Sequence, residues 1–78
     1  MQTKKSIHLD LRHLEPPEPL RVALEAASRL ERGQTLTALT RFRPVHLFEQ
    51  LQAMELEWED EEAAEGHWVT TCWHQPLD

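Results

Sequence analysis

The sequence has a single cysteine and only two glycines in its 78 residues, and each shortage excludes a class of site. One thiol, Cys72, excludes an internal disulfide framework and any Cys-X-X-Cys redox or zinc pair. Two isolated glycines cannot form a glycine-rich phosphate loop. No stretch approaches the roughly 20 apolar residues of a membrane span, and no apolar run follows residues 1–5. We therefore expect a cytoplasmic protein in which residues 1–5 are loose.

Basic residues are also scarce, since eight Lys and Arg residues stand against fourteen Asp and Glu residues, for a formal net charge of −6. Nucleic acid is attracted chiefly by clustered basic residues, so no nucleic-acid partner is expected. Seven of the acidic residues lie between Glu55 and Glu65, with no basic residue among them. This run lacks the D-x-D-x-D-G loop of Ca²⁺ sites and predicts a solvated face instead.

The five histidines do not have the spacing of metal ligands, because the sequence contains no HxxxH or HExxH motif and no Cys/His pair of ligand type. No nucleophile with its base and no paired catalytic carboxylates can be named either. Cys72 lies beside Trp73 in a predicted strand, away from any helix start, so we expect a packed and inert thiol. The sequence therefore predicts no metal, no cofactor and no enzyme. The histidines are His8, His13, His46, His67 and His74.

Residues 7–20 predict a strand that leads directly into a helix. Apolar residues alternate with polar ones over residues 7–12, which is the period of a strand with one buried face. Prolines have no N–H to leave unpaired, so three of them suit the first turn of a helix, and two glutamates suit its positive dipole end. These residues are Glu15, Pro16, Pro17, Glu18 and Pro19.

Apolar residues at spacings of three and four predict two helices. The first continues to Gly33, where a glycine can take the left-handed conformation that closes a helix. The second is short and covers residues 44–54, with Pro44 at its start. The apolar stripes are Leu20, Ala23, Leu24, Ala27 and Leu30 in the first helix, and Leu47, Phe48, Leu51 and Met54 in the second.

Three further strands are predicted after the first helix. Residues 35–40 are rich in β-branched side chains and predict a strand in which Leu36 and Ala38 are buried. A third strand begins near Leu56 and has one apolar and one acidic face, and a fourth covers residues 67–73 after a turn.

The predicted order of elements is βαβαββ, and 78 residues suffice for one domain with a modest core. Short turns joining a strand, a helix and a strand give a right-handed crossover, so the first two strands should be parallel. We therefore expect a single α/β (α+β) domain over residues 1–78. It is a two-layer sandwich, with both helices on one face of a four-stranded mixed sheet.

Three tryptophans are a large apolar load for a small core, and Trp58 and one tryptophan of the fourth strand are expected to fill it. Alternation places Trp68 and Cys72 on one face of that strand and Trp73 on the other. One tryptophan must therefore point away from the helices. Either the open sheet face is a partner surface, for example in a homodimer, or polar neighbours partly cover that tryptophan.

The stretch LDLRHLEPPEPL resembles the active-site segment of the TusA/SirA family of sulfur-carrier proteins, which is roughly L-D-x-R-G-L-x-C-P-x-P before a helix. The matching positions are Leu9, Asp10, Arg12, Leu14, Pro17 and Pro19. Pro16 occupies the position of the sulfur-carrying cysteine. The chain is more similar to a cysteine-less, TusA-like branch of unassigned function, found alone or fused to hemerythrin-like domains. This resemblance implies the same sandwich, with strand order 1-2-4-3 and the last strand antiparallel to the others.

Basic residues are predicted to gather at one edge of the sheet. Because the first two strands are parallel, their carboxyl ends lie at the same edge, together with the starts of both helices. Helix starts offer unpaired N–H groups and a positive dipole end, so this edge is the expected site for a small anion, a carboxylate or an acidic partner loop. Alternatively, Glu15 and Glu18 pair with these arginines. The candidate binding residues are Arg12, His13, Arg41, Arg43 and His46.

Three classes of function follow from these observations. The leading expectation is a small non-catalytic binding or accessory module that presents the arginine-bearing edge to an anionic ligand or a protein partner. The second is a sulfur-transfer protein of the TusA type, against which Pro16 counts directly. The third is a structural domain that associates with itself through the open sheet face.

Overall fold

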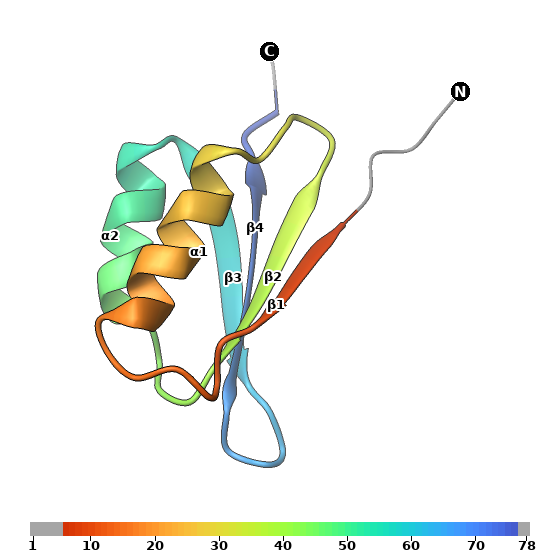
Figure 1. Ribbon diagram of the computed structural model, residues 1–78. Helices are drawn as coiled ribbons and strands as arrows, with labels where there is room; N and C mark the ends of the chain where they lie inside the picture. The colour runs from red at the N-terminus through yellow and green to blue at the C-terminus, as the bar shows by residue number, and fades with distance from the viewer. Residues whose placement is uncertain (1–5, 77–78) are drawn as a thin grey trace.

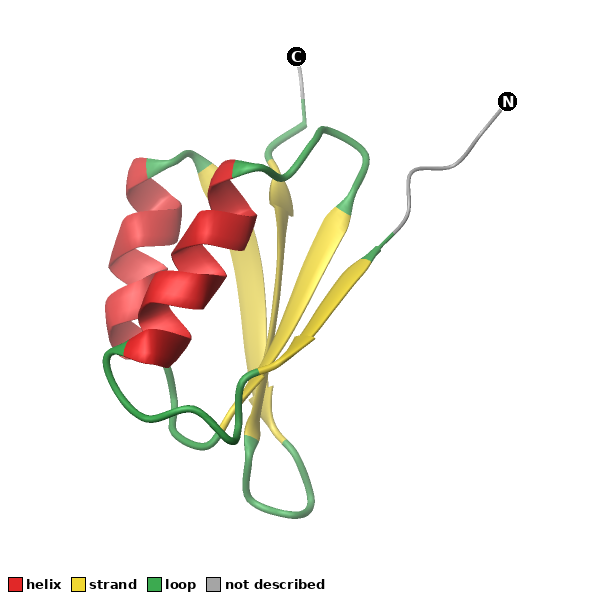
Figure 2. Cartoon of the chain, in the orientation of Figure 1, coloured by secondary structure: helices red, strands yellow, loops and turns green. Residues whose placement is uncertain are grey.

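The helices and strands of the chain form two layers in a computed structural model, which describes residues 6–76. Both helices lie on the same face of a single sheet, and no helix or strand of residues 6–76 covers the other face (Figures 1 and 2). The segment 1–5, expected to be loose, lies outside the described residues. The elements are β1 (Ile7–Asp10), α1 (Glu18–Ser28), β2 (Thr35–Thr40), α2 (Val45–Ala53), β3 (Leu56–Glu62) and β4 (Trp68–His74).

The strand order is β1-β2-β4-β3, as predicted. β1 and β2 are parallel, whereas β4 is antiparallel to both of its neighbours. The register places Leu36 of β2 opposite Ile7 on one side and Cys72 on the other. The carboxyl ends of β1 and β2 therefore meet at one edge of the sheet, where α1 and α2 also begin (Figure 1).

The core lies between the helices and the sheet, and Leu51 of α2 is its most buried large side chain, with 0% of its surface exposed. The predicted buried pair of β2, Leu36 and Ala38, is confirmed. In α1 the centre of the stripe is made by two alanines, while Leu20 and Leu24 are half-buried at its margins. The fully buried apolar residues are Leu11, Ala23, Ala27, Leu30, Leu36, Ala38, Leu47, Leu51, Leu56 and Cys72.

The limits of α1 differ from the prediction at both ends. The helix begins at Glu18, so Pro17 caps it and Pro16 precedes it, and among the three prolines Pro19 alone lies in the first turn. At the other end it stops at Ser28, because the N–H of Arg29 donates to the carbonyl of Ala26 in a tighter turn. Gly33 does have a positive φ, of 90°, but in the loop before β2.

Contacts distant in the sequence hold the segment that follows α1. The carbonyl of Leu30, which would continue the helix, lies 2.7 Å from Nε2 of His74 at the end of β4. Arg32 donates from Nη1 to the carbonyl of Gln75 at 2.8 Å. These two contacts join the loop after α1 to the end of β4.

The alternation along β4 places one tryptophan on each side of the sheet, as predicted. Thr70 and Cys72 are buried toward the helices, so Trp73 is on the open face. There its indole Nε1 donates to Oε1 of Glu57 at 3.1 Å, which partly covers the ring. On the helix side, Trp58 of β3 is stacked on Phe48 of α2, with 5.6 Å between ring centroids and 15° between planes.

Neither α1 nor α2 is long and apolar enough to cross a membrane, and residues 6–76 contain no other helix that could.

Candidate functional site

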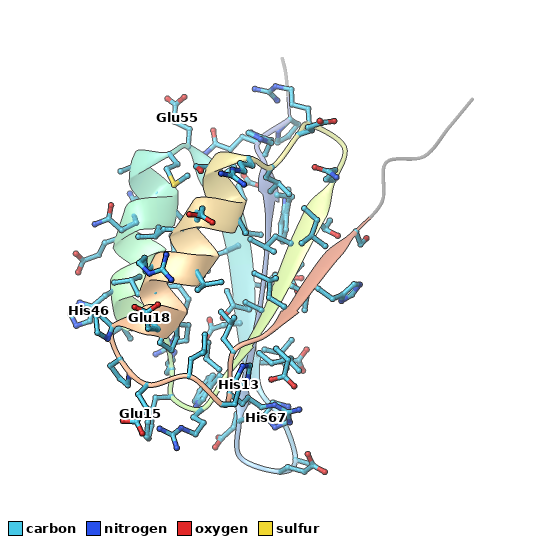
Figure 3. All side chains as sticks on the ribbon, viewed as in Figure 1. His13, Glu15, Glu18, His46, Glu55 and His67 are labelled. Atoms are coloured by element: carbon cyan, nitrogen blue, oxygen red, sulfur yellow. The ribbon has the colours of Figure 1, made fainter. Side chains whose placement is uncertain are left out.

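A pocket of about 240 Å³ opens at the edge where β1 and β2 end and both helices begin. One part of its lining comes from the loop after β1 and the first turns of α1, within residues 14–23. The other part comes from the end of β2 and the start of α2, residues 40–47. Figure 3 shows His46 and Glu18 at the two helix starts, with His13 and Glu15 at the same end of the molecule. The pocket therefore lies at the edge predicted from the topology.

Most of the pocket lining is apolar. The prolines contribute rings without an N–H, so the backbone presents few donors to the interior of the pocket. The two most exposed large apolar side chains of the described chain also belong to it, since Phe42 is 67% and Val45 47% exposed. Exposed apolar side chains gathered at a hollow are typical of interaction sites. The apolar lining residues are Leu14, Pro16, Pro17, Pro19, Leu20, Ala23, Phe42, Pro44, Val45 and Leu47.

The charged groups of the lining have the same sign. They are Arg41 and Arg43; the imidazole of His46 also belongs to the lining, and no Asp or Glu does. Glu15 lies in the loop before α1 and Glu18 is the first residue of that helix, and neither belongs to the lining. Glu18 accepts a hydrogen bond from Nε of Arg21 at 2.9 Å, and this contact lowers its pKa. The alternative in which Glu15 and Glu18 neutralise Arg12, Arg41 and Arg43 is therefore wrong.

Arg41 is the cationic group of the pocket that has no carboxylate partner among residues 6–76. Its guanidinium lies over the ring of Phe42, 5.4 Å from the centroid. Both side chains are exposed. A cation on an exposed aromatic ring keeps its hydrogen-bond donors available, because the ring occupies its face rather than its edge. Arg41 can therefore donate to an anion that enters from solvent.

Arg43 is held by three partners. Its Nε donates to Oδ2 of Asp60 at 2.8 Å, and its guanidinium lies 5.6 Å from the ring centroid of Phe48 and 5.5 Å from that of Trp68. The carboxylate of Asp60 raises the pKa of Arg43. The side chain of Asp60 is only 15% exposed. The prediction that the acidic run forms a solvated face is therefore wrong at this residue. Arg43 joins the start of α2 to the β3–β4 hairpin.

Replacing Arg43 by alanine should lower the melting temperature by roughly 4–8 °C, because contacts to two rings and one carboxylate are lost together. Arg43→Lys should recover little of this loss, since a single ammonium cannot stack on two rings and donate to Asp60 at once. Thermal unfolding followed by circular dichroism measures both shifts. Arg41→Ala is the control and should leave the melting temperature nearly unchanged; equal losses at Arg41 and Arg43 would contradict this assignment.

Arg12 turns away from the pocket and binds Asp10. Its Nε and Nη2 donate to the two carboxylate oxygens at 2.8 Å and 2.7 Å, and its backbone N–H donates to Oδ1 at 3.2 Å. The side-chain bonds from Arg12 hold the pKa of Asp10 well below its usual range. His13 follows on the surface, outside the pocket lining. The structure thus brings together three of the five candidate binding residues, Arg41, Arg43 and His46, and leaves Arg12 and His13 apart.

The remaining motif residues divide between two roles. Asp10 and Arg12 close the end of β1, whereas Pro16, Pro17 and Pro19 line the pocket. A thiol at the position of Pro16 would therefore lie in this lining.

Cys72 is not part of the pocket lining and is packed in the core, with 3% of its surface exposed. Burial raises the pKa of its thiol to about 11. Within residues 6–76, no three His, Cys, Asp or Glu side chains gather closely enough to hold a metal ion.

The prediction from the sequence named arginines and histidines for this site and did not include its apolar side chains. Phe42 and Val45 carry the strongest signal. Phe42 stands between two arginines in a loop that follows a strand. It therefore belongs to no buried face of a helix or strand. An exposed apolar side chain at that place could have been predicted.

One comparison with known proteins gives a match. The model of a family described as "Uncharacterized conserved protein (DUF2249)" matches residues 8–74, a span that contains the whole pocket lining. No curated protein and no solved structure matches the chain.

Proposed function

The chain belongs to the uncharacterised family DUF2249, and from the chemistry of its pocket we propose that it is a small non-catalytic binding module. Its ligand or partner carries an apolar group beside an anionic group. The apolar group enters the space between the starts of α1 and α2, and the anion accepts hydrogen bonds from Arg41.

The observation that carries this proposal is the composition of the lining. An apolar pocket has two arginines, one histidine and no carboxylate, in a chain whose net charge is −6. Apolar burial contributes about 25 cal/mol for each Å² removed from water, and a charge-assisted hydrogen bond fixes the orientation of the bound anion. An uncharged apolar ligand would gain only from apolar burial, and an inorganic anion would gain only from the hydrogen bond.

The start of α2 supports the same choice of ligand. Its first turn contains no acidic residue, so the positive end of its dipole is not neutralised from within the helix. His46 lies in that turn and is exposed. The potential at this end of the pocket is therefore favourable to a carboxylate.

We expect 4-phenylbutyrate to bind the pocket and its uncharged amide to bind more weakly. In an NMR titration, amide shifts should appear in residues 13–20 and 41–47. Arg41→Gln should weaken binding of the carboxylate by roughly fivefold to tenfold, the range for loss of one charged hydrogen bond at a partly exposed site. Added salt should weaken it too, since exposed charges are screened over about 8–10 Å.

Arg29→Gln is the matched control, because it removes the same charge from an exposed arginine outside the pocket lining. It should leave the affinity unchanged. Equal binding of the acid and its amide, or shifts confined to residues 68–74 of β4, would refute the proposed site.

A role in sulfur transfer is the second candidate, supported by the resemblance of residues 9–20 to the TusA segment. Against it, Pro16 has no group that can hold sulfur, and Cys72 is packed in the core. Self-association through the open sheet face is the third, and its support is the half-buried Trp73 on an uncovered face. We favour the binding module because its site combines an apolar pocket with a cationic side chain, Arg41.

A further inference from the structure

We infer that the occupant of this pocket is an acidic segment of a protein partner. One bulky apolar side chain of the segment lies between the starts of α1 and α2, and an Asp or Glu near it pairs with Arg41. This inference rests on the proposed function, because it names the class of partner that the same pocket binds.

The apolar lining has exposed as well as buried side chains. In the pocket of about 240 Å³, Leu47 and Ala23 are buried already. Phe42 and Val45 also belong to the lining but are 67% and 47% exposed, so a small ligand inside the pocket leaves part of their surface in water. A polypeptide that passes over the opening would cover both. Aromatic and arginine side chains in adjacent positions, as in Phe42 and Arg41, are also the residue types that dominate binding energy at protein interfaces.

The charge of the lining is complementary to that of an acidic segment. The cations of the lining meet no carboxylate within it, and Arg41 has none in the part of the chain that the structure describes. Asp60 neutralises Arg43, and Glu15 lies on the same loop as the prolines without lining the pocket. A second copy of this chain is a poorer occupant, because a two-fold contact over the pocket would place Arg41 near its own equivalent. An acidic partner segment removes this repulsion.

The segments that line the pocket are conformationally restricted. Prolines at positions 16, 17 and 44 restrict the two loops of the lining, and Pro19 restricts the first turn of α1. Arg43 is fixed by Asp60, Phe48 and Trp68, which positions the start of α2. A restricted site loses little conformational entropy on binding. Only the entropy of ordering the partner segment then opposes binding, so the affinity is higher.

The test is a selection from a random peptide library displayed on phage, made on the full chain and in parallel on Arg41→Glu. The wild-type protein should enrich peptides with an aromatic or large aliphatic residue close to Asp or Glu. Arg41→Glu should lose these peptides and enrich ones with Lys or Arg in their place. Arg29→Glu, with the same change of charge outside the lining, should enrich the wild-type set.

A second variant separates a polypeptide from a small ligand. Phe42→Ser should weaken the best wild-type peptide by at least about tenfold in fluorescence anisotropy, and should weaken 4-phenylbutyrate by a clearly smaller factor, because a peptide covers the exposed ring as well as the pocket; equal losses would contradict a polypeptide occupant. Circular dichroism checks that the variant is folded, which the exposure of Phe42 leads us to expect.

Several outcomes would overturn the inference. Enriched peptides without acidic residues would remove the charge argument, and peptide-induced amide shifts on β4 would move the site to the open sheet face. Sedimentation of the protein with phosphatidylserine vesicles, with no peptide enriched, would favour a lipid surface. If 4-phenylbutyrate binds the pocket and no peptide is enriched, the inference fails and the proposed function stands. If the carboxylate does not bind and peptides shift only β4, both fail.

Discussion

Replacing Leu51 by alanine should lower the free energy of unfolding by about 2–5 kcal/mol, as expected when a fully buried leucine is truncated and its space is only partly refilled. Leu51 is 0% exposed and lies in α2 against the sheet. Small domains have total stabilities near the lower end of about 5–15 kcal/mol, so the variant is expected to be largely unfolded at physiological temperature. Denaturant melts followed by circular dichroism measure the loss.

Two further variants test whether the loss comes from the cavity. Leu51→Met keeps most of the volume and should lower the free energy of unfolding by less than about 1.5 kcal/mol. Leu24→Ala, in the half-buried margin of α1, should have a clearly smaller effect than Leu51→Ala. If Leu24→Ala were the more destabilising of the two alanine variants, the assignment of helix faces would be wrong.

Cys72 should react with iodoacetamide in the folded protein at least roughly 100-fold more slowly than an exposed cysteine. The thiolate is the reactive form, and at pH 8 a pKa of about 11 in place of 9.0 leaves about one hundredth as much of it. Burial of the sulfur adds a steric barrier. The rate should rise with pH as far as pH 11, and denaturation in guanidinium should restore the ordinary rate. Mass spectrometry of timed samples gives both rates.

The same burial predicts the outcome of a sulfur-transfer assay. After incubation with a cysteine desulfurase and labelled cysteine, the chain should carry no persulfide, because Pro16 has no thiol and Cys72 is not accessible. Cys72→Ser provides the blank for both experiments. Stable and stoichiometric label on Cys72 would show that the core opens far more readily than its packing indicates, and would revive the sulfur-carrier alternative.

Most of the fold could be predicted because it depends on local patterns. The alternation of residues 7–11 and 35–40 and the apolar stripes of the helices each repeat with the period of their own element. The strand order was implied by the resemblance to the TusA segment, and the handedness of the crossover gave only the parallel pairing of the first two strands. The contacts of the segment after α1 could not be predicted, because they are made with His74 and Gln75, more than forty positions away along the chain.

The position of the candidate site was predicted from the sequence, but its apolar lining was not. Topology alone brings the ends of β1 and β2 to the starts of the helices. Three arginines in the two loops then have three different environments: Arg12 binds Asp10, Arg43 binds Asp60, and Arg41 lies over Phe42. Nothing local distinguishes Arg41 from Arg43, since they are separated by one residue. Arg43 differs from Arg41 because β3 and β4 place Asp60 and Trp68 beside it.

The placement of the three tryptophans gives the protein a set of built-in optical reporters. The chain has no tyrosine, so its near-ultraviolet emission comes from these indoles. Trp68 is in contact with Arg43, a residue of the pocket lining, whereas Trp73 is on the opposite face of the sheet and bonded to Glu57. A variant that keeps Trp68 alone would signal occupation of the pocket by a change in emission, and one that keeps Trp73 alone would signal association through the open face. Two unlabelled samples could therefore distinguish the two binding modes at micromolar concentration.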